Sequence, residues 1–529
     1  MGQNLKLDVA IIGGGHNGLV AAAYLARAGL AVTVFEGRAR LGGATLTEEL
    51  WPGFRFSTGA HQLHAFPAKI ARELGLFDHG LEVVPRDGMV RLRLDGSYDG
   101  DFELNLPNNR MVRARLTMEE RAGLQAYLDL QARFYRFLAP YTLTIPPTLD
   151  ELRRRAAGTP DEEVLRLITT KTLWELQDSF LPTERLRDFF AVEASAVAAN
   201  PNAFALARGV VDEPLHGTQE PPLNGYVRGG MGNFADVIRQ SAKGAGATFR
   251  LGQPVERILV EKNRARGLRL ADGTEIQAQA VLSCTDPKTT FLRLLPASQV
   301  EPNLRRRVEE LATQVSCYKF LAAISELPQW RGWDGDPDFP ARGGIQLGVS
   351  RQEVQRAYDD LAQGRPARRP IISFGVPSMR DPTLAPPQFH TASLFIYPAP
   401  ARLRQGSWDD IRTEVAEALI DQITEYAPNF RRSIVNYKLR TPLDIEREQG
   451  MPDGCIWHIQ HTPEQLYGSR PLPELAAYRA PIAGLYLGGS GQHPGGEVSG
   501  IPGHNAAQEI LKDLKSFTAH RADEKFAAS

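Results

Sequence analysis

The chain opens with a hydrophobic segment that predicts a buried strand. Residues 7–12 are almost continuously apolar, which is typical of a parallel strand covered on both faces. A glycine-rich turn with the spacing Gly13-x-Gly15-x-x-Gly18 follows, and apolar residues at helical spacing then predict a helix over 19–28. A second apolar stretch, 31–35, predicts a strand that ends at Glu36. The first 36 residues therefore predict a β-α-β unit.

The same patterns predict a longer series of elements downstream. Apolar residues at helical spacing predict helices over 118–136, 160–176 and 182–197. After the glycine-rich segment 229–232 we expect a helix over 233–243, then a pair of strands, 248–251 and 255–261, and further strands over 265–270 and 274–284. Residues 291–470 alternate strands and helices, and from 482 a short strand leads into a second glycine-rich motif, 484–496, and a last helix over 498–514.

The first glycine motif has the spacing of a dinucleotide-binding turn. Gly13 makes the tight turn, Gly15 lets backbone N–H groups approach a pyrophosphate, and Gly18 lets the helix lie close to the strand. Glu36 lies about 20 residues beyond the glycines, where a carboxylate can accept hydrogen bonds from both hydroxyls of an adenine-linked ribose. The alternative is a glycine-rich turn without function, but the two flanking strands and the acidic residue favour a bound dinucleotide.

Composition narrows the classes of protein. A length of 529 residues suggests two or three domains, and 42% hydrophobic with 23% charged residues is an ordinary globular balance. A net charge of −1 gives no electrostatic reason to expect a nucleic-acid partner. The three cysteines lie far apart, so neither a disulfide framework, a zinc site nor a CxxC redox pair is predicted. No run of about 18 apolar residues predicts a membrane span, and the chain enters its first strand without a signal peptide, so we expect a cytoplasmic protein.

Several segments resemble one family of flavoproteins. Residues 36–45 resemble the E-x-R-x-x-x-G-G segment of FAD-dependent amine oxidases and carotenoid desaturases, and 493–503 are similar to the matching element of phytoene desaturases. Residues 229–232 and 285–287 are typical of the same group. Residues 426–429 and 470–474 are similar to segments found in one branch of that group. This branch holds desaturase-type carotene ketolases and pyridine nucleotide-disulfide oxidoreductase domain-containing proteins.

This resemblance implies an α/β fold of the glutathione-reductase/amine-oxidase type. A Rossmann-like FAD-binding domain would be assembled from residues 1–115, 222–290 and 471–515. A largely helical cap would cover 116–221, an inserted α+β substrate domain 291–470, and a tail 516–529.

The resemblance also implies which residues hold a non-covalent FAD. Those on the adenosine and phosphate side would be Gly37, Arg38, Gly42, Gly43 and Ala44, and Val255 would meet the adenine through its backbone. Gly489 and Ser490 fall where related flavoproteins often keep an acidic residue, so backbone amides would make those contacts here. Val498 would head the last helix and direct its positive end at the flavin, with Gly495 and Gly496 letting the backbone approach the ring.

Catalytic candidates are few, and each has a structural alternative. His493 and His61 could touch substrate or flavin, or could order their loops, and the same holds for His64. Arg470 could bind substrate or form a structural ion pair. His458 and His461 lack a carboxylate arrangement, so no metal site is predicted. Cys284 is predicted to be a buried strand end, and 229–232 a loop close to FAD.

The implied activity is hydride transfer from a hydrophobic substrate to FAD, with oxygen or a quinone as the electron acceptor. Carotenoids, terpenoids and alicyclic ketones all suit the resemblance, and peripheral contact with a membrane stays open. Because only one dinucleotide site is visible, we expect NAD(P)H to be a poor reductant. A flavin amine oxidase is the alternative enzyme, although no Trp or Tyr pair near the second motif suggests an aromatic cage. A flavin-binding interaction protein with structural FAD is the alternative of another class.

Overall fold

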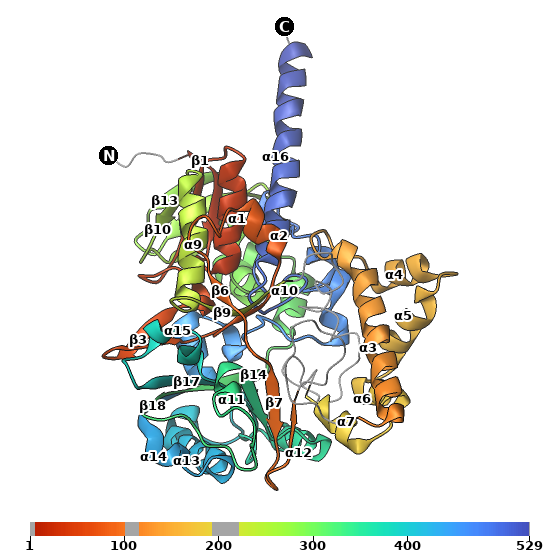
Figure 1. Ribbon diagram of the computed structural model, residues 1–529. Helices are drawn as coiled ribbons and strands as arrows, with labels where there is room; N and C mark the ends of the chain where they lie inside the picture. The colour runs from red at the N-terminus through yellow and green to blue at the C-terminus, as the bar shows by residue number, and fades with distance from the viewer. Residues whose placement is uncertain (1–5, 101–115, 193–221, 528–529) are drawn as a thin grey trace.

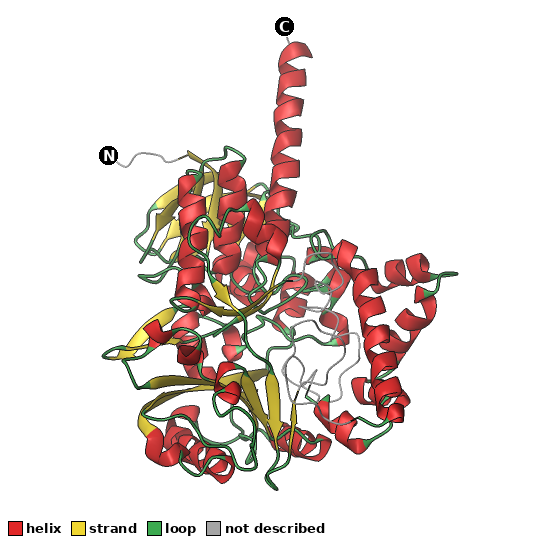
Figure 2. Cartoon of the chain, in the orientation of Figure 1, coloured by secondary structure: helices red, strands yellow, loops and turns green. Residues whose placement is uncertain are grey.

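A computed structural model describes residues 6–100, 116–192 and 222–527, with side chains up to residue 515. Its main parts are two seven-stranded sheets and a separate group of helices, with two smaller sheets of two and three strands (Figure 1, Figure 2).

The first sheet has the order β10-β2-β1-β13-β12-β11, with β19 beside β13. Its strands are β1 (Lys6–Ile12), β2 (Val32–Phe35), β10 (Thr248–Arg250), β11 (Val255–Glu261), β12 (Arg264–Leu270), β13 (Glu275–Ser283) and β19 (Leu485–Leu487). β1, β2, β10, β13 and β19 pair in parallel, and β11 and β12 pair antiparallel. The strand over 248–250 thus pairs with β2, not with 255–261 as predicted. Three distant parts of the chain meet in this one sheet.

Three helices pack against one face of the first sheet. They are α1 (His16–Arg27), α9 (Met231–Gly244) and α16 (Ile501–Ala527), and their apolar residues form one core with β1 and β2. The last helix begins three residues later than predicted and continues through the segment predicted as a tail, projecting from the molecule in Figure 1. No helix in the described part of the chain is both long and apolar enough to cross a membrane.

The second sheet has the order β18-β14-β17-β16-β15-β7-β8. Its strands are β7 (Met89–Leu92), β8 (Tyr98–Gly100), β14 (Val315–Ile324), β15 (Gly344–Leu347), β16 (Ile371–Gly375), β17 (His390–Pro400) and β18 (Ile434–Arg440). Helix α13 (Trp408–Tyr426) shares its core. The predicted first segment, 1–115, is therefore too long for the first domain, because β7 pairs with β15 and carries β8 into the second sheet.

The group of helices at the right of Figure 1, the helical block, comprises α3 (Met118–Leu138), α4 (Leu149–Ala156), α5 (Asp161–Thr170), α6 (Leu173–Phe180) and α7 (Glu184–Phe189). The helix predicted over 160–176 is two helices, because Thr172 and Glu175 form a capping box that starts α6. Only α7 represents the helix predicted over 182–197, and residues 193–197 lie outside the described residues. Arg185 of this block forms an ion pair of 2.7 Å with buried Asp99 of β8.

The other α-helices and β-strands of the described chain, which are joined by turns and by short 3-10 and π segments, are α2 (Ala68–Glu73), α10 (Pro302–Glu309), α11 (Phe339–Arg342), α12 (Arg351–Ala362), α14 (Phe430–Ser433), α15 (Pro442–Gln449), β3 (Thr47–Trp51), β4 (Phe54–Ser57), β5 (Leu63–Phe66), β6 (Val83–Val84) and β9 (Leu223–Val227).

Candidate functional site

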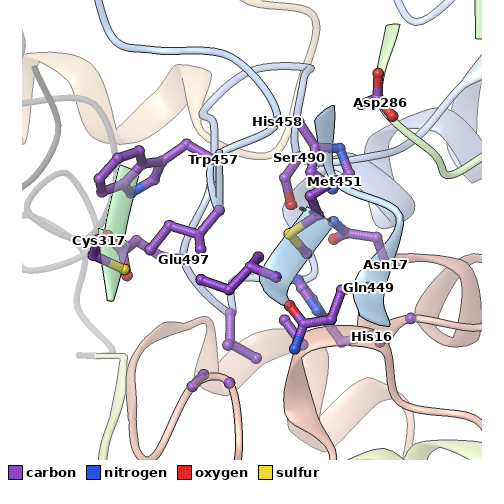
Figure 3. Close-up of a pocket in the computed structure, with 18 of the residues that line it drawn as sticks. His16, Asn17, Asp286, Cys317, Gln449, Met451, Trp457, His458, Ser490 and Glu497 are labelled. Carbon is purple, nitrogen blue, oxygen red and sulfur yellow. Dashed lines mark hydrogen bonds between the residues drawn. The ribbon is translucent and has the colours of Figure 1, made fainter. Parts of the chain in front are cut away.

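A cavity of about 730 Å³ is lined by residues of the first sheet, the second sheet and the helical block. In Figure 3, His16, Asn17, His458 and Ser490 gather toward one side of this cavity, while Trp457, Cys317 and Glu497 gather toward the other. We call the side formed by the first glycine motif the nucleotide end.

The glycines of the nucleotide end are required by close packing. A Cβ at Gly18 would lie 2.1 Å from the carbonyl oxygen of Gly13, so only glycine lets α1 approach the turn. Gly15 forms an isolated β-bridge with Gly42, and a Cβ at Gly43 would lie 3.0 Å from the Cα of Gly15. The two loops therefore make a narrow cradle of backbone around this end of the cavity.

Three buried polar atoms face the nucleotide end without a hydrogen-bond partner among the described residues. They are His16 Nε2, Asn17 Oδ1 and His458 Nδ1, and all three residues line the cavity. Burial lowers the pKa of His16 to about 4 and that of His458 to about 3, so both rings are neutral at pH 7. Because an unsatisfied buried polar atom costs about 1–3 kcal/mol, this end fits a ligand rich in hydroxyl and phosphate groups, as FAD is.

Glu36 is held in place by backbone amides at the end of β2. Its carboxylate accepts hydrogen bonds from the N–H of Gly14 at 2.8 Å and from the N–H of Arg38 at 3.0 Å. The residue is 8% exposed and lines the cavity. The carboxylate is thereby fixed beside the cradle, where the ribose of a dinucleotide would lie.

Most predicted cofactor residues line this one cavity. The structure brings together Gly13, Gly15, Gly18, Glu36, Gly37, Arg38, Gly43, Ala44, Val255, Ser490 and Val498, with the catalytic candidate His61. Gly42, Gly489, Gly496 and His493 are not among the lining residues. Gly42 supports the cradle from behind, with its N–H donating to the carbonyl of Gly14, and Gly489 packs on the backbone of Cys284 and Thr285.

The glycines at 495 and 496 have a packing role that the sequence did not predict, and their approach to the flavin ring stays a prediction. A Cβ at Gly496 would lie 2.4 Å from Cδ1 of Trp457, and one at Gly495 would lie 2.1 Å from Nε2 of His461. These glycines thus make room for two side chains of the protein. Val498 lines the cavity but precedes α16, which begins at Ile501, so it does not head that helix.

His493 lies in the packed interior. Its ring lies 5.4 Å from the ring of Tyr467, and its carbonyl accepts a hydrogen bond from the hydroxyl of Tyr478 at 3.0 Å. Burial lowers its pKa to about 3. The geometry therefore supports the loop-ordering alternative for His493.

Among the described residues, Arg470 has no ion-pair partner, and it does not line the cavity. Its fully buried guanidinium donates to six backbone carbonyls, those of Trp457, Ile459, Gln460, Gln465, Ser490 and Gln492, at 3.0–3.3 Å. The predictions of a substrate ligand and of an ion-pair partner were both wrong, because the N–H donors of the guanidinium bind backbone carbonyls. Arg470 joins the loop that carries Trp457 and His458 to the second glycine motif.

The opposite wall of the cavity contains His61 and a buried lysine. His61 Nδ1 lies 3.3 Å from the hydroxyl of Ser393, and its ring lies 5.0 Å from that of Phe395. Burial, with nearby Lys319 and Arg86, holds the pKa of His61 well below its usual value. Lys319 is 2% exposed and donates to the carbonyl of Ser57 at 2.8 Å.

Lys319 was not predicted as a cavity residue, although the sequence contains one indication of it. It is the only charged residue in the otherwise apolar or small strand 315–324. A lysine enclosed in such a strand needs buried acceptors.

Cys284 lines the cavity, and burial raises the pKa of its thiol, in keeping with a non-nucleophilic residue. Among the described residues, no group of three His, Cys, Asp or Glu side chains could hold a metal ion.

A glycine cradle at the ends of parallel strands, opening into a cavity walled by a second sheet, is the arrangement of two-domain flavoproteins. The chain belongs to the family of flavin containing amine oxidoreductases, which residues 18–347 match. It is an FAD-dependent oxidoreductase with an α/β fold, and the predicted fold class and cofactor are confirmed.

Relatives that match over almost the whole chain place it within this family. It is 33% identical to the mouse pyridine nucleotide-disulfide oxidoreductase domain-containing protein 2, over 97% of this chain and 94% of the relative. It is 27% identical to a component of the limonene dehydrogenase of Castellaniella defragrans (97% and 96%) and 23% identical to phytoene desaturase of Fusarium fujikuroi (97% and 90%). The predicted phytoene desaturase-like branch is confirmed.

Among solved structures, a putrescine oxidase variant has the same fold. The match between the two structures has a TM-score of 0.62 at 16% sequence identity. It covers 97% of this chain and 99% of the putrescine oxidase chain.

Proposed function

We propose that this protein oxidises a hydrophobic substrate by taking a hydride from one of its carbon atoms, and that oxygen or a quinone removes the electrons. The observation that carries the proposal is the continuity of the cavity, which runs from the glycine cradle to a wall of the second sheet. Bound non-covalently, FAD would supply the hydride acceptor, and the two relatives named for a terpene and a carotenoid support a hydrophobic substrate.

The aromatic rings, His61 and Lys319 at the cavity wall support positioning rather than proton transfer. Aromatic rings of Phe395, Tyr397, Trp457 and Phe190 line it and would exclude water from the substrate. His61 is neutral at pH 7 because its pKa is held well below its usual value, so it would orient groups by hydrogen bonding without carrying charge. Lys319 donates to the carbonyls of Ser57 and Gly59, in the segment whose Ala60 N–H donates to the carbonyl of Ala44 at the nucleotide end.

Anaerobic reduction of the bound flavin tests the proposal. The FAD-loaded protein is mixed with terpenoids, carotenoids, alicyclic ketones and, as the competing class, primary amines, and the absorbance of the oxidised flavin is followed. We expect a hydrophobic non-amine substrate to bleach the flavin and oxygen or a quinone analogue to restore its colour. Reduction by amines alone would favour an amine oxidase, and no reduction by any compound would favour a structural FAD.

A further inference from the structure

Among the described residues, three carboxylates line the cavity, those of Glu36, Asp286 and Glu497. Glu36 is held at the nucleotide end by two backbone N–H groups. Asp286 accepts from the N–H of Thr289 at 2.8 Å and is 2% exposed. In the described part of the chain Glu497 accepts no backbone hydrogen bond, and its side chain is 24% exposed. Glu497 is therefore the cavity carboxylate whose oxygens can meet a substrate.

The backbone holds Glu497 in a conformation that favours glycine. Its φ angle is +63°, in the left-handed region that residues with a side chain rarely adopt. The two preceding residues, Gly495 and Gly496, pack closely against His461 and Trp457, which fixes the path of the chain at this point. Because non-glycine residues in this region are costly to the fold and cluster at active sites, the strain indicates that the carboxylate serves the cavity.

A histidine from the other end of the chain lies against this carboxylate. Nε2 of His64 lies 2.9 Å from Oε2 of Glu497. His64 belongs to β5, which pairs with β9, and it also lines the cavity. No lysine or arginine among the described residues forms an ion pair with Glu497. We call these two residues the His–Glu pair, in which the ring can orient the carboxylate and stabilise its charge.

The His–Glu pair lies on the side of the cavity away from the nucleotide end. Figure 3 shows Glu497 on the same side as Cys317 and Trp457. Burial, with a contribution from the charge of Glu497, raises the pKa of the Cys317 thiol to about 12, so the carboxylate lies near β14. Lys319 and Arg440 also lie near Cys317, but Lys319 donates to backbone carbonyls and Arg440 forms an ion pair of 2.5 Å with a glutamate of α15. The charge of Glu497 is therefore left for the substrate side of the cavity.

We propose that Glu497 accepts the proton that the substrate loses during oxidation, and that His64 positions its carboxylate. The hydride leaves one substrate carbon with the electron pair of its C–H bond and goes to the oxidant, FAD. A proton leaves the neighbouring carbon or oxygen for Glu497, and the electron pair of that second bond forms the new double bond. Loss of hydride leaves the carbon electron-poor, which makes the neighbouring proton acidic enough for a carboxylate. The inference rests on the proposed function, because it names the proton acceptor in the same cavity.

Ring opening of 5-nitrobenzisoxazole tests the carboxylate without a redox step. A base removes the C3 proton of this apolar probe, its N–O bond breaks, and a coloured cyanophenolate forms. We expect the FAD-loaded, oxidised protein to accelerate this reaction, and Glu497→Gln to lose at least about tenfold of the rate. His64→Gln should lower kcat and leave KM unchanged, as expected for a residue that positions the base. Glu275→Gln, at an exposed ion pair of β13, should react like the unaltered protein.

A glycine variant separates the chemical role of Glu497 from a structural one. Glycine adopts a φ angle of +63° without strain, so Glu497→Gly should unfold at the same or a higher urea concentration than the unaltered protein. The same variant should lose the probe reaction, and added formate, which fits the vacated space, should restore part of the rate. Gln388→Gly, at an exposed position with a φ angle of +69°, is the matched control and should keep the full rate.

Three outcomes would overturn the inference. They are no acceleration of the probe reaction by the unaltered protein, an unchanged rate in Glu497→Gln, and a Glu497→Gly variant that unfolds more easily and is not rescued by formate. The probe reaction involves no hydride transfer, so it is independent of whether any compound reduces the flavin, which tests the proposed function separately.

Discussion

Glu36 links the first glycine motif to cofactor retention at the scale of single residues. We predict that Glu36→Ala weakens FAD binding by about 1–3 kcal/mol, because the variant loses a carboxylate that the N–H groups of Gly14 and Arg38 hold beside the cradle. Reconstitution of the apoprotein, followed by flavin fluorescence, measures the change. Glu275→Ala, at an exposed ion pair of β13, is the matched control. Unchanged FAD occupancy in a variant carrying both Gly15→Val and Glu36→Ala would refute the assignment of this end of the cavity.

His493 provides a pH-dependent prediction. Its folded-state pKa, about 3, lies below the usual 6.5, so the unfolded chain binds a proton that the folded chain rejects. Its contribution to stability is complete above pH 6.5 and is lost as the pH falls toward 3. We expect the stability of the unaltered protein, relative to His493→Asn, to fall by about 1.4 kcal/mol between pH 7.5 and 5.5. Urea unfolding at the two pH values measures this, and an identical pH dependence in both proteins would contradict the burial of a neutral ring.

At the scale of elements, the second glycine motif acts through its contact with Trp457. Gly496→Ala would place a Cβ 2.4 Å from Cδ1 of this ring, which lines the cavity, and should displace it. We predict that substrate reduces the flavin at least about tenfold more slowly in the variant, while unfolding changes by less than about 3 kcal/mol, as for a typical overpacked site. Gly244→Ala, which meets no atom within 4 Å, is the control and should change neither quantity. A normal rate in Gly496→Ala would show that Trp457 does not shape the site.

The elements also show what local pattern can and cannot predict. The first glycine motif is contiguous in the sequence, so its turn, its helix and Glu36 were predictable from spacing alone. The pairing of β7 with β15 was not, because it joins positions as distant in the sequence as Arg91 and Gln346. The role of Arg470 was hidden for the same reason, since its six acceptors are backbone carbonyls that any residue type could supply. The split between α5 and α6 was detectable, because Thr172 and Glu175 have the spacing of a capping box.

At the scale of the whole molecule, residues of both sheets line one cavity. The proposed electron transfer, from substrate to FAD and then to an acceptor, would take place in that cavity. The chain contains no CxxC pair, and the glycine-rich segment at 229–232 forms the turn before α9 and the first two residues of that helix, with Gly230 packed on Thr47. FAD would therefore be the sole redox group, reduced by substrate in the cavity and reoxidised by a diffusible acceptor.

An anaerobic titration of the FAD-loaded protein with NADPH and NADH tests this central claim most directly. We predict that the flavin stays oxidised, or is reduced far more slowly than by the organic substrate, while dithionite bleaches it at once and oxygen or a quinone analogue restores its colour. Rapid, stoichiometric bleaching by NADPH would contradict the account and would make the protein a reductase or a monooxygenase.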